Sequence, residues 1–187
     1  VAGNIGFATN GTHYFEAFRF LTDENLVEVT AWFSPEIVPN PRGLQFQDRA
    51  GCIRAVTASG KRLYMEIGSD QGHGGHAIYA CRNGIVTINE LTGEFFSSER
   101  EGQYRKLPTT RYGMPAVNMQ RTIQPSEVID SSASVLTALL NEVNSVTGED
   151  GRMVVELLVA AYQSNEKGNV PVHLEGKLEQ ERIFPWA

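Results

Sequence analysis

Apolar residues near the start of the chain repeat with the spacing of a helix. They stand three and four positions apart, which places them on one face of an α-helix: Tyr14, Ala17, Phe18 and Leu21. Thr12 precedes them and belongs to the residue types that cap helix N-termini. Glu16 lies in the first turn, where a carboxylate interacts favourably with the helix dipole. The pattern therefore predicts a helix that Thr12 caps.

Alternating apolar and polar residues then predict strands. Residues 26–33 (LVEVTAWF) alternate in this way, as is typical of a strand with one wetter face. The following segment, SPEIVPNPRG, contains three prolines and is predicted to be a loop. Further strand-like runs are GCIRAVTA from Gly51, RLYMEIG from Arg62, AIYACR from Ala77 and IVTINEL from Ile85. The Arg82-Asn83-Gly84 step predicts a hairpin with a type I′ turn, because Asn-Gly accepts positive φ.

The period changes in the second half of the chain. EFFSS and QYRKL are weaker strand candidates, and residues 107–116 (LPTTRYGMPA) are predicted to be a long loop. Residues 126–146 and 150–164 then predict two helices, and residues 169–174 (NVPVHL) a last strand. This order indicates an α+β fold, an open, mostly antiparallel sheet with helices packed on one face. The length suits a single domain, residues 1–187.

Composition excludes several classes of partner. The net charge is -6, and Lys and Arg are not clustered, so we expect neither a nucleic-acid nor an anionic-membrane surface. The longest apolar run, residues 153–162 (MVVELLVAAY), contains Glu156 and is too short to span a membrane. The first residues lack a secretory signal. Cys52 and Cys81 stand in apolar runs and are expected to be reduced, buried thiols of a cytoplasmic protein.

Common cofactor and catalytic motifs are absent from the sequence. The glycine cluster of residues 72–76 (GHGGH) lies between two strand-like runs, whereas a dinucleotide-binding turn precedes a helix. We find no P-loop, no Gly-x-Ser-x-Gly elbow and no His-Glu-x-x-His. His73 and His76, with Asp70, have a spacing that can hold a metal ion, but such loops are more commonly solvated turns. No metal or cofactor site is predicted in these residues.

Three segments resemble the C-terminal domain of the Gfo/Idh/MocA oxidoreductases, which include glucose–fructose oxidoreductase and inositol dehydrogenase. NGTHYFEAFRFLT with the strand LVEVTAWF resembles the start of that domain, where the family has an acid, any residue, Gly, any residue, His, two residues and Asp. DSSASVLTALLNEV and GEDGRMVVELLVAAYQSNEKGNVPVHL resemble its closing helices and final strand. The hairpin GSDQGHGGHAIYACRNGIVTI fits less specifically. The resemblance thus covers nearly the whole chain.

The resemblance implies one half of an enzyme. Family members bind NAD or NADP in a preceding Rossmann domain that also supplies a lysine near the nicotinamide, and neither is present in these residues. The chain begins VAGNIG without an initiator methionine, so we expect it to be a fragment. The implied fold is the glyceraldehyde-3-phosphate dehydrogenase-like C-terminal domain, with a homo-oligomer formed through a face of the sheet. The implied substrate is a small sugar, polyol or related hydroxy or keto compound.

The resemblance also assigns residues. His13 falls on the catalytic histidine, which exchanges a proton with the substrate hydroxyl, a role that suits imidazole near neutral pH. Glu16 falls where the family usually has Asp. Thr9 replaces the acid that stands four residues before the histidine and orients it or the substrate, so we expect an altered mechanism. Asn10 lies beside it and is a candidate substrate contact.

The sequence offers two further candidate substrate contacts, and it also leaves two alternative functions open. Arg111 and Tyr112, in the predicted long loop, suit stacking and directional hydrogen bonds to a sugar. The replaced acid at Thr9 is also compatible with a non-enzymatic domain for ligand binding or assembly. A metal-dependent lyase or isomerase using His13, His73 and His76 is a third alternative.

Overall fold

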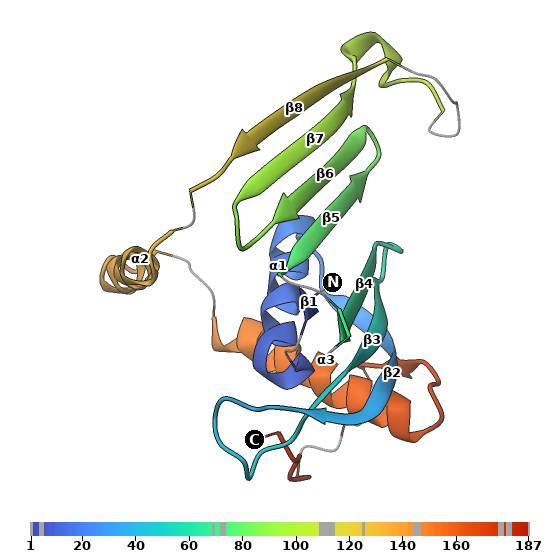
Figure 1. The fold of residues 1–187 in the computed structure, drawn as a ribbon, viewed down its shortest axis with the longest axis vertical. Helices are drawn as coiled ribbons and strands as arrows, with labels where there is room; N and C mark the ends of the chain where they lie inside the picture. Colours follow the sequence, from blue (N-terminus) through green and yellow to red (C-terminus); the bar gives the residue numbers. More distant parts are fainter. Residues whose placement is uncertain are drawn as a thin grey trace. The chain divides into compact units, whose positions relative to one another are not determined.

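The computed structural model describes residues 2–3, 6–68, 70–71, 74–108, 115–124, 126–143, 147–175, 178 and 181–186. The chain forms two compact units. The core unit comprises Ala2–Gly72 and Ala138–Ala187, and the meander unit comprises His73–Thr137. Figure 1 shows the elements of both units. The α+β class predicted from the sequence is confirmed, although the strands divide between two sheets. The single domain spanning residues 1–187 stays a prediction.

The core unit contains a five-stranded sheet in the order β1-β4-β3-β2-β9. Its strands are β1 (Ala2–Gly3), β2 (Leu26–Val38), β3 (Asp48–Thr57), β4 (Arg62–Gly68) and β9 (Val172–His173). The β1–β4 pair is parallel and the other pairs are antiparallel. The helices of this unit are η1 (Phe7–Gly11), α1 (Thr12–Thr22) and α3 (Gly148–Glu166).

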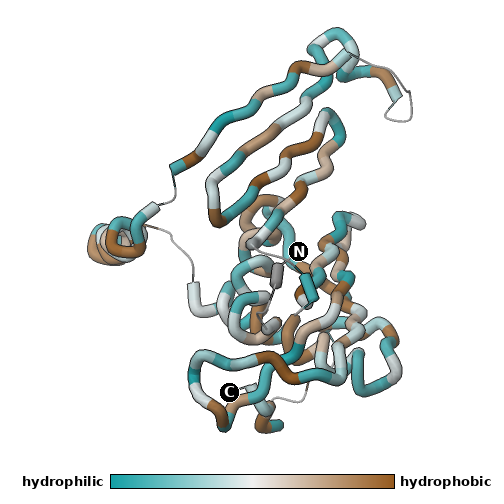
Figure 2. Tube along the Cα trace, viewed as in Figure 1, coloured by the Kyte–Doolittle hydropathy of each residue, from teal (hydrophilic) through white to brown (hydrophobic). Residues whose placement is uncertain are grey.

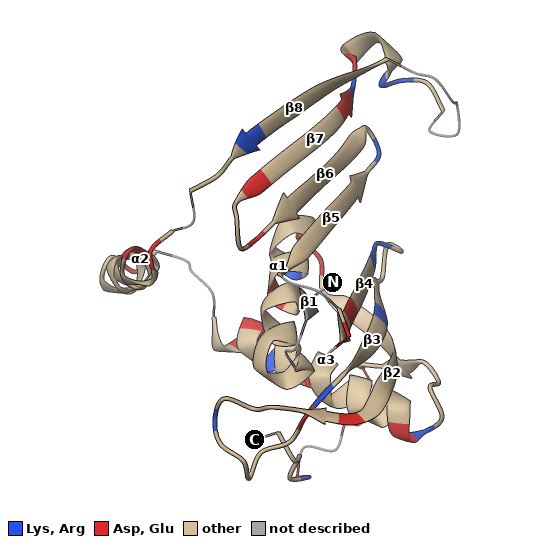
Figure 3. Ribbon diagram, viewed as in Figure 1, with Lys and Arg blue, Asp and Glu red and all other residues tan. Residues whose placement is uncertain are grey.

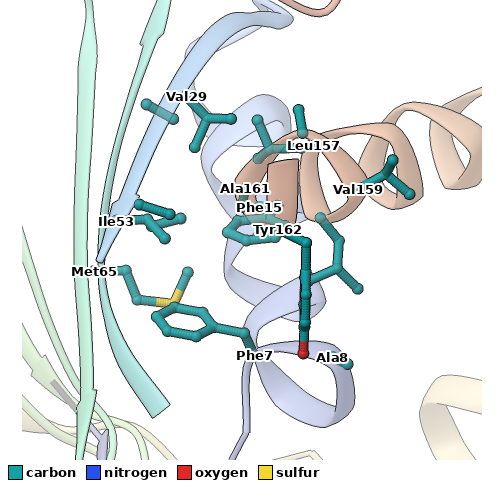
Figure 4. Close-up of a cluster of buried hydrophobic side chains, with 14 of the residues drawn as sticks. Phe7, Ala8, Phe15, Val29, Ile53, Met65, Leu157, Val159, Ala161 and Tyr162 are labelled. Atoms are coloured by element: carbon teal, nitrogen blue, oxygen red, sulfur yellow. The ribbon is translucent and has the colours of Figure 1, made fainter. Parts of the chain in front are cut away.

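The hydrophobic core lies between one face of this sheet and helices α1 and α3. Figure 4 shows Val29, Ile53 and Met65 projecting from the strands toward Phe15 and Leu157 on the two helices. The α1 side chain at the centre of this contact is therefore Phe15, which the predicted apolar stripe left out. Leu21, which that stripe included, is exposed. Tyr14 and Phe18 of the predicted stripe do pack against the core, so the buried face is shifted only slightly and centres on Phe15.

Beyond β9, polar side chains at the end of α3 accept hydrogen bonds from the backbone at the edge of strand β2. β9 pairs with β2 only at Glu28 and Val29. Farther along β2, the amide of Ala31 donates to Ser164 Oγ at 3.0 Å, and the amide of Phe33 donates to Asn165 Oδ1 at 2.8 Å. These hydrogen bonds satisfy backbone groups of β2 that have no neighbouring strand at this edge.

The meander unit contains a four-stranded antiparallel sheet in the order β5-β6-β7-β8. Its strands are β5 (His76–Cys81), β6 (Gly84–Asn89), β7 (Glu94–Arg100) and β8 (Ala116–Thr122). The hairpin predicted at Arg82-Asn83-Gly84 is present, with Cys81 paired to Gly84. The predicted type I′ turn is wrong, because Arg82 and Asn83 both have negative φ.

Helix α2 (Val128–Leu140) follows β8, and none of its described residues is buried. Figure 2 shows that it is nonetheless one of the more hydrophobic segments. Its exposed apolar side chains include Val128, Ile129, Val135, Leu136, Leu139 and Leu140.

Several predicted boundaries are corrected by the structure. β2 runs through Pro35 to Val38, into the segment predicted to be a loop, and β3 begins at Asp48 rather than at Gly51. QYRKL is not a strand, and its first two residues belong to the short 3-10 helix η2 (Gly102–Tyr104). The helix predicted over residues 126–146 is shorter, and α3 begins at Gly148, within the predicted turn. Strand β8 was not predicted.

The structure also bears on the predictions about the two cysteines and about membrane-spanning segments. Both cysteines are free, but Cys81 is exposed and Cys52 only half-buried, so the prediction of two buried thiols is wrong. Within the described part of the chain, no helix combines the length and apolar character needed to cross a membrane.

Candidate functional site

The segment that carries His13 begins with a π-helical turn. η1 follows Gly6 and runs directly into α1. The carbonyl oxygen of Gly6 accepts from the amide of Asn10 at 3.0 Å and from that of Gly11 at 3.4 Å. Thr12 therefore lies within a continuous helix, and its predicted role as N-cap is wrong. Single π-turns of this kind often occur at functional sites.

A buried carboxylate from β3 caps the start of this helix. Asp48 Oδ1 accepts from the amide of Ala8 at 3.0 Å, and Oδ2 accepts from the amide of Thr9 at 2.8 Å. The Thr9 hydroxyl donates to the same Oδ2. The amide of Arg49 is the fourth donor, 2.7 Å from Oδ1. An N-cap side chain normally belongs to the residue at the start of the helix. Here Asp48, which belongs to strand β3, accepts the hydrogen bonds of the first helical amides instead.

The space around Asp48 is closed. The residue is 0% exposed. A Cβ placed on Gly6 would lie 2.0 Å from Asp48 Cγ, so only glycine fits there. Tyr162 is a buried member of the same core cluster as Ala8, and Figure 4 shows both residues. Burial, followed by the charge of Asp48, raises the pKa of Tyr162.

His13 has a different environment from Thr9, one turn earlier. It is exposed, in the first turn of α1. Within the described residues the imidazole makes no hydrogen bond or ion pair. The helix start is therefore fixed from the core side, while the side chain of His13 is free to contact a ligand.

Glu16 is held in an ion-pair network on α1. The Arg19 guanidinium donates to both of its oxygens, from Nε to Oε2 at 2.8 Å and from Nη2 to Oε1 at 2.6 Å. Arg19 Nη1 also lies 3.2 Å from Asp150 Oδ1 at the start of α3. Figure 3 shows these oppositely charged segments of α1 and α3. The hydrogen bond with Glu16 raises the pKa of Arg19. The network gives Glu16 a structural role, and its catalytic role stays a prediction.

The remaining predicted site residues are less informative. Asn10 is half-buried within η1. Arg111, Tyr112 and His73 lie outside the described residues. Among the residues that are described, no group of three metal-ligating side chains converges.

Two solved structures show what this fold resembles. An NAD-binding protein from Listeria innocua matches 95% of this chain, with a TM-score of 0.63 and 18% sequence identity. An aldose–aldose oxidoreductase from Caulobacter crescentus matches 87% of this chain, with a TM-score of 0.61 and 20% identity. The fold is one that these proteins share. The resemblance to the oxidoreductase C-terminal domain is thus confirmed at the level of the fold.

The matches cover only part of each neighbour. The chain spans about half of their length, 50% of the first and 45% of the second. No protein-family model matches the sequence, and no curated protein matches it.

The contact of Asp48 with the start of the helix is a feature of this site that the sequence did not reveal. Asp48 stands three residues before the strand-like run that was taken to begin at Gly51, and it lies 39 positions from Thr9 in the chain. The available signal was a lone acidic residue at the start of an otherwise apolar and basic strand. That signal does not indicate which helix the carboxylate caps.

Proposed function

We propose that residues 1–187 form the substrate-side domain of an NAD(P)-dependent oxidoreductase that acts on a sugar, polyol or related hydroxy or keto compound. The observation that carries the proposal is the fold likeness to an NAD-binding protein and to an aldose–aldose oxidoreductase, over about half the length of each. A match over about half of each neighbour fits the C-terminal domain that the sequence resemblance implies.

His13 is the proposed catalytic residue. When a substrate alcohol is oxidised, its carbon loses a hydride and its oxygen loses a proton, leaving a carbonyl group. A nicotinamide bound by another domain takes the hydride. The exposed imidazole of His13 takes the proton and returns it in the reverse direction, as general bases and acids do.

Thr9 and its neighbours have supporting roles in this proposal. The Thr9 hydroxyl donates its hydrogen bond to Asp48 and carries no charge. Thr9 therefore does not act as a base, and proton transfer depends on His13. Asn10, Arg111 and Tyr112 are proposed substrate contacts. Glu16, as the counterpart of an acidic family residue, is proposed to act from its ion pair with Arg19.

Assembly forms a second part of the proposal. Ile78 pairs with Thr87, and Thr87 pairs with Phe96, so these side chains share one face of the meander sheet. Ile85 lies on the same face, two residues from Thr87. Ile78 is 64% exposed and Phe96 40%. We place a homo-oligomer contact on this face, because exposed apolar patches commonly mark interfaces.

Light scattering tests the assembly. The protein is expected to be an oligomer that Ile78→Lys dissociates. Leu44→Lys, at a fully exposed position in the core unit, is the matched control and is expected to leave the oligomer intact. A monomeric protein, or an oligomer that tolerates Ile78→Lys, would overturn this part.

The experiment on function uses the natural protein that contains this chain. NAD and NADP binding is measured first, and then turnover with a panel of aldoses, polyols and their keto forms. His13→Ala is expected to lower kcat by about 100-fold or more without changing cofactor affinity. His173→Ala is the matched control, because His173 is an exposed histidine of β9 paired with Glu28. Failure to bind either nucleotide, or unchanged turnover in His13→Ala, would refute the proposal. Ligand binding without turnover would favour the non-enzymatic alternative.

A further inference from the structure

We propose that Asp48 is a positioning residue of this site. Its carboxylate, reaching from β3, stands in for the acid absent at position 9 and fixes the helical turn that presents His13. The catalytic consequence rests on the proposed function, whereas the anchoring of the helix does not.

The first support is the number of donors that converge on Asp48. Capping requires only an oxygen acceptor, and neutral Ser, Thr or Asn side chains cap helices as well as Asp does. Asp48 is fully buried, and among the described residues no Lys, Arg or His forms an ion pair with it. Its four hydrogen bonds come from Ala8, Thr9 and Arg49. Two carboxylate oxygens that together accept four hydrogen bonds provide more than a simple cap needs.

The second support is that two of those four hydrogen bonds come from Thr9. Its amide and its hydroxyl both donate to Oδ2. The side chain is thereby turned toward Asp48 and its rotamer is fixed. Position 9 thus lies in contact with a carboxylate, although that carboxylate belongs to a different strand.

The third support is the path from Asp48 to His13. Thr9 and His13 belong to one continuous helix, whose first turn is also closed by the Gly6 carbonyl. The close approach of Gly6 to Asp48 leaves no room for this turn to shift toward β3. A change at Asp48 is therefore transmitted to His13 through the backbone. Asp48 itself is buried and does not contact substrate.

β3 is shaped to bring Asp48 into this place. The pairing of β2 with β3 is irregular between Phe33 and Ile37, where a bulge places the extra residues on β2. Opposite this bulge the alternation of buried residues along β3 changes phase, so that Asp48 and Ala50 are buried before Gly51 and Ile53 after it. Gly51 has a φ of +136°. Bulges of this type redirect side chains next to functional sites.

The test combines Asp48→Asn with an exchange of the two residues. Asp48→Asn keeps the shape and removes the charge. We expect faster amide hydrogen exchange over residues 8–13 and a kcat lower by about 10–100-fold, with the KM for the nucleotide unchanged. The double substitution Thr9→Asp with Asp48→Thr returns a carboxylate and a hydroxyl to the same contact. It is expected to recover most of the kcat that Asp48→Thr alone loses.

The outcomes separate this inference from the proposed function. Unchanged amide exchange in Asp48→Asn would overturn the anchoring role, whether or not the protein is an enzyme. Wild-type kcat in Asp48→Asn, or a double variant no more active than Asp48→Thr, would overturn the positioning role. Unchanged turnover in His13→Ala would instead refute the proposed function.

If Asp48→Asn does not fold, Thr9→Val serves as the second variant. It removes a single hydrogen bond and is expected to show the same effects on amide exchange and kcat at smaller size. Wild-type exchange and kcat in that variant would refute the inference.

Discussion

Thr9 gives both of its hydrogen-bond donors to one oxygen of Asp48. Its amide nitrogen lies 2.8 Å from Oδ2, and its hydroxyl donates to the same atom. Because Asp48 is wholly buried at the start of β3, this contact ties the start of the His13 helix to the central sheet. The same contact therefore contributes to the stability of the fold and to the placement of the candidate catalytic residue.

Removing the Thr9 hydroxyl is expected to destabilise the fold. Thr9→Val keeps the shape of the side chain and leaves the buried carboxylate one donor short, which costs about 1–3 kcal/mol. Urea unfolding measures the loss. Thr137→Val is the control, because its exposed hydroxyl bonds only to Ala133 of its own helix, and we expect a change within about 0.5 kcal/mol. Equal effects of the two substitutions would contradict the anchoring contact.

Ser164→Ala is expected to weaken the edge of the core sheet. The Ser164 hydroxyl accepts from the Ala31 amide at 3.0 Å and donates to the Val170 carbonyl at 2.6 Å. Ser164 and Ala31 are both 0% exposed, so removal of the hydroxyl leaves the buried Ala31 amide unpaired, at about 1–3 kcal/mol. Thermal or urea unfolding checks this. Ser134→Ala, an exposed serine bonded to Asp130 of its own helix, is expected to have little effect, and a comparable loss there would count against this interpretation.

Glu24 is expected to titrate far below an ordinary glutamate. The hydrogen bond from Lys61, at 2.6 Å, and that from Ser59 lower the pKa of Glu24 from 4.5 to about 2. Because the folded-state pKa is the lower one, this contact stabilises the fold above about pH 4.5. The stabilisation is lost as the pH falls toward 2. A carbon-detected NMR titration measures the pKa directly. Lys61→Met should move it back toward 4.5 and Lys106→Met should not, and a pKa near 4.5 in the wild-type protein would contradict the contact.

The two thiols are expected to react at different rates. Cys81 is exposed, whereas Cys52 is half-buried, and burial followed by the charge of Glu66 raises the pKa of Cys52. Since the thiolate is the reactive form, iodoacetamide should label Cys81 first. Peptide mass spectrometry of a time course resolves the two sites. Faster labelling of Cys52 in the folded protein would contradict the burial pattern.

Local patterns predicted the elements that depend on local sequence. The run RLYMEIG matches β4 (Arg62–Gly68) residue for residue, because its alternation follows directly from the burial of Met65 and Ile67. β8 was missed for the opposite reason. All its side chains are exposed, and it is a strand only through its pairing with β7.

The candidate site was predicted only in part, because its key contact is not local. The exposed His13 at the start of a helix was identified from its motif. Asp48 was not, since the alternation of buried residues along β3 changes phase at Gly51, opposite the bulge in β2. Simple alternation back from Ile53 places Asp48 on the outer face. The geometry of that bulge depends on β2, and no pattern within β3 encodes it.

The proposed proton-transfer role of His13 is tested most directly by chemical rescue in the natural protein that contains this chain. His13→Gly removes the imidazole and leaves space for a free one. We expect single-turnover reduction of the bound nicotinamide to slow by about 100-fold or more, and added imidazole to restore a large part of the rate. A folded, nucleotide-binding His13→Gly variant that turns over at the wild-type rate, or that imidazole does not rescue, would contradict the role of His13 as general acid and base.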